Sequence, residues 1–162
     1  MNESLVIHPS HYLDEKCPYE CWDVASDILR HKKYSCDIGA LVFNGIKYGW
    51  RMGSKKGDYG KNQNQKNIED LQKVIQYSNK VILNNSSFNY KNSNDSPIYR
   101  YDFETVMQSL MSTKDYSNDI KFYVKSILSN LWFAGDKLYD LNICMSDVIY
   151  YSECAIKEFQ KQ

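Results

Sequence analysis

The chain has 162 residues, which fits one domain, or two very small ones, with a hydrophobic core of useful size. Its 20 acidic and 20 basic residues balance, so the overall charge gives no reason to expect duplex nucleic acid or a membrane as partner. No apolar run reaches membrane-spanning length and residues 1–12 lack the layout of a signal peptide, so we expect a cytoplasmic protein whose anion sites, if any, are local.

The first notable segment, His8 to Tyr12, precedes any predicted helix. Pro9 disfavours helix at His8, so this segment is predicted to be extended or a turn. It presents the imidazoles of His8 and His11 and the phenol of Tyr12, side chains that can carry protons or donate hydrogen bonds to phosphate. A polar N-terminal arm without a specific role is the alternative.

Three amphipathic helices are predicted in the first half. Ser35 or Asp37 can cap the second helix, and Gly53 is its stop signal. A loop rich in Gly, Lys, Asn and Gln, residues 53–66, follows it and is too polar to be buried. The predicted helices span about 18–30, 36–52 and 68–83.

The second half repeats the pattern of the first after a polar linker at 84–98. At a shift of 82 positions Trp50 corresponds to Trp132 and Gly53 to Gly135, and apolar positions also match. We therefore predict an all-α fold of two similar three-helix units, 1–83 and 99–162, packed as one globular domain. Chance similarity between amphipathic helices is the competing account.

One face of the second helix carries polar and cationic side chains. At helical spacing they lie opposite an apolar face, so we expect them on the solvent side of the helix. Such a face can bind an anion, and the loop that follows can supply two further cations to the same site. A solvated helix surface without a ligand is the alternative. The residues are Asn44, Lys47, Tyr48 and Arg51, followed by Lys55 and Lys56 in the loop.

The two halves differ at this face. The positions that correspond to Asn44, Lys47, Tyr48 and Arg51 in the second half have lost the positive charges, while the tryptophan and the glycine stop persist. This difference suggests that the first half carries a functional site and that the second half is structural. Neutral drift of surface residues would produce the same difference. The corresponding residues are Ser126, Ser129, Asn130 and Phe133.

The third helix begins with Glu69 and Asp70 and carries Tyr77 two turns after Asp70. Acidic residues in a first turn usually complement the helix dipole. Asp70 and Tyr77 share a face, however, and could orient a substrate hydroxyl or a cation. The chain has no phosphate loop of the Walker kind, no dinucleotide fingerprint and no Ser-His-Asp order.

Four ordered blocks resemble a family of small phage proteins, long catalogued as a domain of unknown function, whose members are commonly described as nucleotide kinases. The blocks cover about residues 8–82. They read His-Pro-Ser-His-Tyr at 8–12, Tyr-Glu-Cys-Trp-Asp-Val at 19–24, Phe-Asn-Gly-Ile-Lys-Tyr-Gly-Trp-Arg-Met-Gly-Ser-Lys-Lys-Gly at 43–57, and Ile-Glu-Asp-Leu-Gln-Lys-Val-Ile-Gln-Tyr at 68–77.

The resemblance implies phosphoryl transfer from ATP or another nucleoside triphosphate to a (deoxy)nucleoside monophosphate. Cations would stabilise charge on the transferring phosphoryl group, while a second set would handle protons. The catalytic candidates are His8, His11, Lys47, Arg51 and Asp70. The substrate-binding candidates are Tyr12, Asn44, Lys47, Tyr48, Arg51, Lys55, Lys56 and Tyr77.

The predicted partners are a nucleotide ligand and further copies of the chain. Magnesium is compatible with such a reaction, but the sequence does not indicate it. A zinc site from His8, His11, Cys17 and Cys21 has suitable ligand types, but its spacing matches no standard zinc module. The long polar insertion after Gly57 and the altered second half depart from the family pattern. Two alternatives therefore stay open: a viral protein that sequesters a nucleotide signal of host defence without catalysis, and a helical adaptor that binds a host protein. A phage-encoded protein would act in the host cytoplasm.

Overall fold

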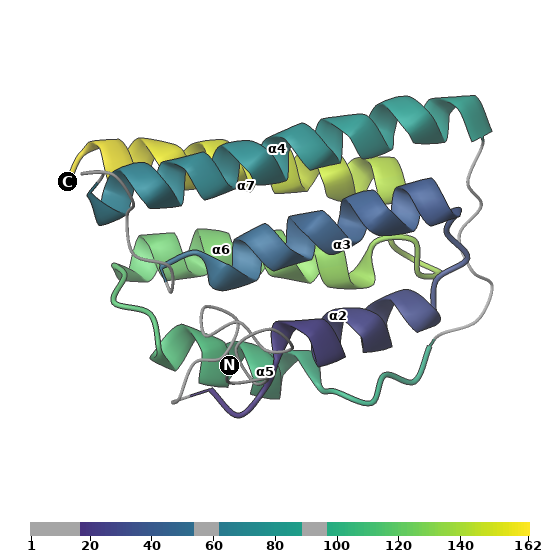
Figure 1. The fold of residues 1–162 in the computed structure, drawn as a ribbon, viewed down its shortest axis with the longest axis horizontal. Helices are drawn as coiled ribbons and strands as arrows, with labels where there is room; N and C mark the ends of the chain where they lie inside the picture. The colour runs from purple at the N-terminus through teal and green to yellow at the C-terminus, as the bar shows by residue number, and fades with distance from the viewer. Residues whose placement is uncertain (1–16, 54–61, 89–96) are drawn as a thin grey trace, which may run out of the picture.

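The computed structural model describes residues 17–53, 62–88 and 97–162, of which residues 86–88 are described by their backbone alone. The described residues form six α-helices and no strand, which confirms the predicted all-α class (Figure 1). The helices are α2 (Cys21–Arg30), α3 (Cys36–Arg51), α4 (Gln63–Phe88), α5 (Phe103–Ser112), α6 (Asn118–Phe133) and α7 (Leu141–Gln160).

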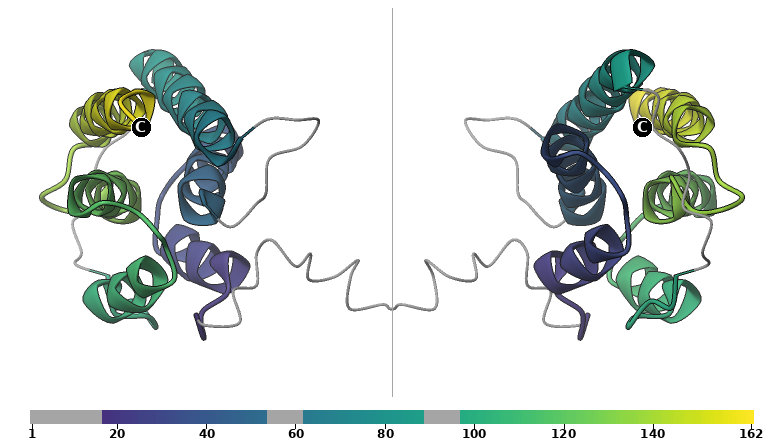
Figure 2. Two further views of the ribbon diagram at one scale, coloured as in Figure 1. Left: turned by 90° about the vertical axis from the view of Figure 1, so that its left-hand side faces the viewer. Right: turned by 90° about the vertical axis from the view of Figure 1, so that its right-hand side faces the viewer.

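The six helices form three stacked pairs. Seen end-on in Figure 2, α4, α3 and α2 make one column, and α7, α6 and α5 make the other. Within the columns α3 packs on α4 and α6 packs on α7, while α4 contacts α7 and α3 contacts α6 between them. The two columns bury their facing sides in one hydrophobic cluster.

Helices α3 and α6 begin and end with the same local chemistry. The Ile38 N–H donates to the Ser35 hydroxyl and the Ile120 N–H to the Ser117 hydroxyl, both over 3.3 Å, so a serine caps each helix. After each helix a glycine takes positive φ, +81° at Gly53 and +80° at Gly135. This conformation favours glycine and ends the helix in the predicted place.

The first two helices of each column also match in length. Helices α2 and α5 each have 10 residues and α3 and α6 each have 16, in register at the shift of 82 positions. Trp50 and Trp132 are both buried next to the glycine turns. A gene duplication as the origin of these two units remains a prediction.

Each column sends a tyrosine to the glycine turn of the other. The Tyr34 hydroxyl donates to the Ala134 carbonyl over 2.5 Å, beside Gly135. In the opposite direction Tyr116 packs so closely on Gly53 that a Cβ at this glycine would lie 2.0 Å from the Tyr116 oxygen. These crossed contacts fix the ends of α3 and α6 against the neighbouring column.

Three predicted helix limits were wrong. Helix α2 begins at Cys21, after Pro18, and α4 spans Gln63–Phe88 where 68–83 was predicted. The early start has a local cause, because Asn62 and Gln65 cap each other: the Gln65 N–H donates to the Asn62 side chain over 2.9 Å and the Asn62 N–H to the Gln65 side chain over 3.1 Å. None of the helices in the described ranges is long and apolar enough to cross a membrane.

Candidate functional site

The end of α3 and the first half of α4 bring several predicted site residues together. Lys47, Tyr48 and Arg51 come from α3, and Asp70 and Tyr77 come from α4. Asn44 lies one turn earlier on α3, where its side-chain amide donates to the Ala40 carbonyl of the same helix over 2.9 Å. The remaining predicted residues, His8, His11, Tyr12, Lys55 and Lys56, lie outside the described residues.

The Tyr48 ring is the centre of this site. The Arg51 guanidinium carbon lies 4.3 Å from the ring centroid, the Lys73 nitrogen 4.9 Å and the Lys47 nitrogen 5.8 Å. These distances are those of cation–π contacts. The Tyr77 ring lies 5.7 Å from the Tyr48 ring at an interplanar angle of 15°, so the two rings are nearly parallel.

Arg51 does not lie on the solvent side of α3, and this expectation was wrong. Only 7% of the residue is exposed, because α4 covers it. Its Nη2 lies 2.8 Å from Asp70 Oδ1, and the Lys66 nitrogen lies 3.0 Å from the same oxygen. Asp70 is only 1% exposed, so one buried carboxylate is held between two buried cations.

The turn that leaves α3 is fixed to the start of α4. The Gly53 N–H and the Gln63 side-chain amide both donate to Asn67 Oδ1 over 3.0 Å. Tyr116 covers this turn from the second column, and burial together with the charge of Asp70 raises the pKa of its phenol. The root of the segment that contains Lys55 and Lys56 is therefore held by both columns.

Several cations gather at this site within the described residues. Lys47, Lys73 and Arg51 lie against the Tyr48 ring, and Lys66 lies 3.9 Å from the Glu69 carboxylate. Arg51 and Lys66 both contact Asp70. Cations beside two tyrosine rings suit an anionic ligand that also carries a flat ring.

Sequence reasoning missed Lys66, Lys73 and Lys80 as site residues. The Lys80 nitrogen lies 5.8 Å from the Tyr77 ring, so α4 carries cations on both sides of this tyrosine. The spacing of Lys66, Lys73 and Lys80 by seven residues puts them on one face of a helix and was the available signal. This spacing places Lys66 on the same helix face only if the helix already includes residue 66. Helix α4 begins at Gln63, whereas the predicted helix began at about residue 68.

The α6 positions that correspond to Asn44, Lys47, Tyr48 and Arg51 are uncharged. Asn130, at the position of Tyr48, donates from its side-chain amide to the Ser126 carbonyl within α6 over 3.0 Å. Phe133, at the position of Arg51, stacks on Tyr139 at 5.4 Å. The loss of charge predicted for the second unit is therefore accompanied by local polar and aromatic contacts.

A second buried polar cluster lies away from this site and was not predicted. Lys32, two residues after α2, contacts Asp136 and donates to the Tyr99 hydroxyl over 2.8 Å, and that hydroxyl donates to Asp136 over 2.6 Å. Burial lowers the pKa of Lys32 and raises that of Tyr99. The cluster joins α2 to the turn after α6, a structural role.

The part of the chain that the structure describes contains no group of three or more His, Cys, Asp or Glu side chains able to hold a metal ion. No family model matches this chain, and neither a curated protein nor a solved structure is similar enough to count as a match.

Proposed function

We propose that the chain binds a nucleotide on the α3–α4 face and that it acts as a nucleoside monophosphate kinase. The observation that supports this proposal is the convergence of Lys47, Arg51 and Lys73 on the Tyr48 ring, next to the parallel ring of Tyr77. Cations contribute affinity for phosphate, and aromatic rings contribute affinity for a base. The family resemblance supplies the reaction class.

In this reaction an oxygen of the nucleoside monophosphate attacks the γ-phosphorus of the triphosphate, and the bond to the leaving nucleoside diphosphate breaks. Two nucleoside diphosphates result. Lys47 and Lys73 are the residues assigned to the phosphate oxygens, where charge-assisted hydrogen bonds are strongest. Tyr48 and Tyr77 are assigned to the base or sugar. Arg51 is assigned a positioning role: Asp70 holds its guanidinium, which contacts the Tyr48 ring.

A second candidate, nucleotide binding without turnover, is favoured by one observation. Asp70 is buried and engaged by both Arg51 and Lys66, so this carboxylate is not available to accept a proton from a substrate. A protein that sequesters a nucleotide signal needs affinity and no such base. The two candidates share the binding site and differ in the product that they release.

The test is to incubate the purified protein with ATP and a panel of nucleoside monophosphates and to separate the nucleotides afterwards. Turnover beyond one equivalent supports the kinase, and a ligand retained unchanged supports sequestration. Retention of nothing contradicts both and favours the adaptor alternative. The matched control replaces Lys33 and Lys137, two exposed lysines away from the site, with alanine; this variant should behave as wild type.

A further inference from the structure

The outer face of α6 and α7 carries four aromatic rings in contact. Phe122 lies 5.6 Å from Tyr123 and 6.1 Å from Tyr151, and Tyr150 lies 5.3 Å from Tyr151. Phe122 is 58% exposed and Tyr150 is 60% exposed. Isolated exposed aromatic residues are common, but a connected group of this size often marks an interaction surface.

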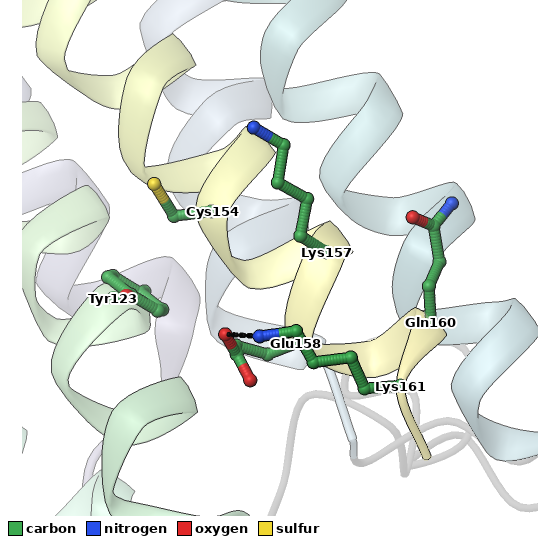
Figure 3. A pocket seen from close by; sticks show the side chains of 6 residues that line it. All are labelled: Tyr123, Cys154, Lys157, Glu158, Gln160 and Lys161. Carbon is green, nitrogen blue, oxygen red and sulfur yellow. Dashed lines mark hydrogen bonds and ion pairs between the residues drawn. The ribbon is translucent and has the colours of Figure 1, made fainter.

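A hollow of about 460 Å³ lies next to these rings, towards the C-terminal end of α7 (Figure 3). Tyr123 closes one side from α6, and Cys154 with Lys157 forms part of the α7 side. The Glu158 and Lys161 side chains, paired at 2.6 Å, form its far end. The hollow therefore has an aromatic wall, the thiol of Cys154 next to Tyr150 of the same copy, and a charged rim.

A stripe of mostly exposed side chains runs along one side of α7. Its positions alternate by four and three residues, so they share one side of the helix and a partner helix can lie along them. The members of the stripe are Ile143, Asp147, Tyr150, Cys154, Lys157 and Lys161.

The central part of this stripe, from Asp147 to Lys157, is complementary to itself when reversed. Tyr150 and Cys154 each lie two residues from Ser152, and Asp147 and Lys157 each lie five residues from it. A two-fold axis perpendicular to α7 at Ser152 would therefore set Tyr150 against the hollow beside Cys154 of a second copy. It would also set Asp147 against Lys157, and a two-fold contact makes each of these pairs twice.

We propose that two copies of this chain pair antiparallel through α7, with the exposed Tyr150 ring of each copy filling the hollow of the other. The self-complementary order of ring, hollow, acid and base along one stripe favours a second copy over an unrelated partner. Antiparallel α7 helices also set helix ends of opposite partial charge side by side. This inference is independent of nucleotide binding, since the α3–α4 face lies on the other column.

The first test is sedimentation or light scattering of the full chain over a range of concentrations. Wild type should dimerise, and Tyr150→Ser should raise the dimer dissociation constant at least about tenfold, as expected for a buried aromatic anchor. Trp22→Ser is the control, because Trp22 is 66% exposed on α2, outside the stripe. A monomeric wild type, or equal effects of the two variants, would overturn the proposal.

The second test fixes the orientation and does not depend on removing an aromatic ring. Asp147→Lys alone and Lys157→Asp alone should each weaken the dimer, because each creates like-charge pairs across the axis. The double variant Asp147→Lys with Lys157→Asp should recover the wild-type dissociation constant. A double variant as weak as the single ones would exclude the antiparallel register.

Discussion

Replacement of Arg51 by alanine tests the buried charge cluster of the α3–α4 site. The change leaves Asp70, only 1% exposed, without the guanidinium 2.8 Å away. Removal of one partner of a buried ion pair costs about 3–5 kcal/mol of unfolding free energy, because the other charge remains buried. Lys66 still contacts Asp70 at 3.0 Å, so we expect a loss near the lower end, about 3 kcal/mol.

Urea unfolding followed by circular dichroism measures this loss. The control is Lys121→Ala, which removes a half-buried lysine from α6 and should change the unfolding free energy by about half a kcal/mol or less. Asp70→Ala in the Arg51→Ala background completes a double-mutant cycle, with an expected coupling of about 1–3 kcal/mol. An Arg51→Ala loss below about 1 kcal/mol would refute the argument that this pair is buried and mutually dependent.

Two further predictions concern the turn after α3 and the alkaline limit of stability. Gly53→Ala should cost more than about 1 kcal/mol of unfolding free energy, since the residue has φ +81° and a Cβ there would meet Tyr116. Gly39→Ala, inside α3 and with the nearest atom 3.9 Å from the added Cβ, should instead raise the unfolding free energy by about 0.5–1 kcal/mol in the same assay. Burial raises the pKa of the Cys144 thiol from 9.0 to about 11. Above pH 9 the thiol therefore ionises in the unfolded chain but stays protonated in the folded protein, which lowers the unfolding free energy. The loss is about 1.4 kcal/mol per pH unit between pH 9 and about 11, and below pH 9 there is none. Cys144→Ala should therefore lose less stability than wild type between pH 8 and about pH 10.5 in urea unfolding, and equal losses would contradict this reasoning.

Helix ends could be predicted where they depend on residues close by in the sequence. Ser35 and Gly53 mark the limits of α3 because a hydroxyl cap and a positive φ depend on chemistry within a few residues. The start of α4 was missed although Asn62 and Gln65 carry the residue types of a capping box. Their surroundings, rich in Asn, Gln, Gly and Lys, resemble a loop in composition.

The sequence predicted which residues form the site better than it predicted which of them are buried. Lys47, Tyr48, Asp70 and Tyr77 were chosen from helical spacing, and the structure brings them together. The burial of Arg51 could not be read from α3 alone, because it depends on α4 covering that side chain and supplying Asp70 and Lys66. Spacing within one helix shows which residues share a face, whereas burial is decided by the neighbouring helix.

The proposed binding of nucleotide phosphate by the cations around Tyr48 can be measured by isothermal titration with a nucleoside triphosphate and a nucleoside monophosphate. Lys47→Ala with Lys73→Ala removes two cations that lie against the Tyr48 ring and keeps the Arg51–Asp70 pair. Each lost charge-assisted contact costs about 1.5–3 kcal/mol, so affinity should fall at least about tenfold for each lysine. We expect a folded double variant with at least a hundredfold weaker binding, and a folded variant that binds as tightly as wild type would contradict the proposed site.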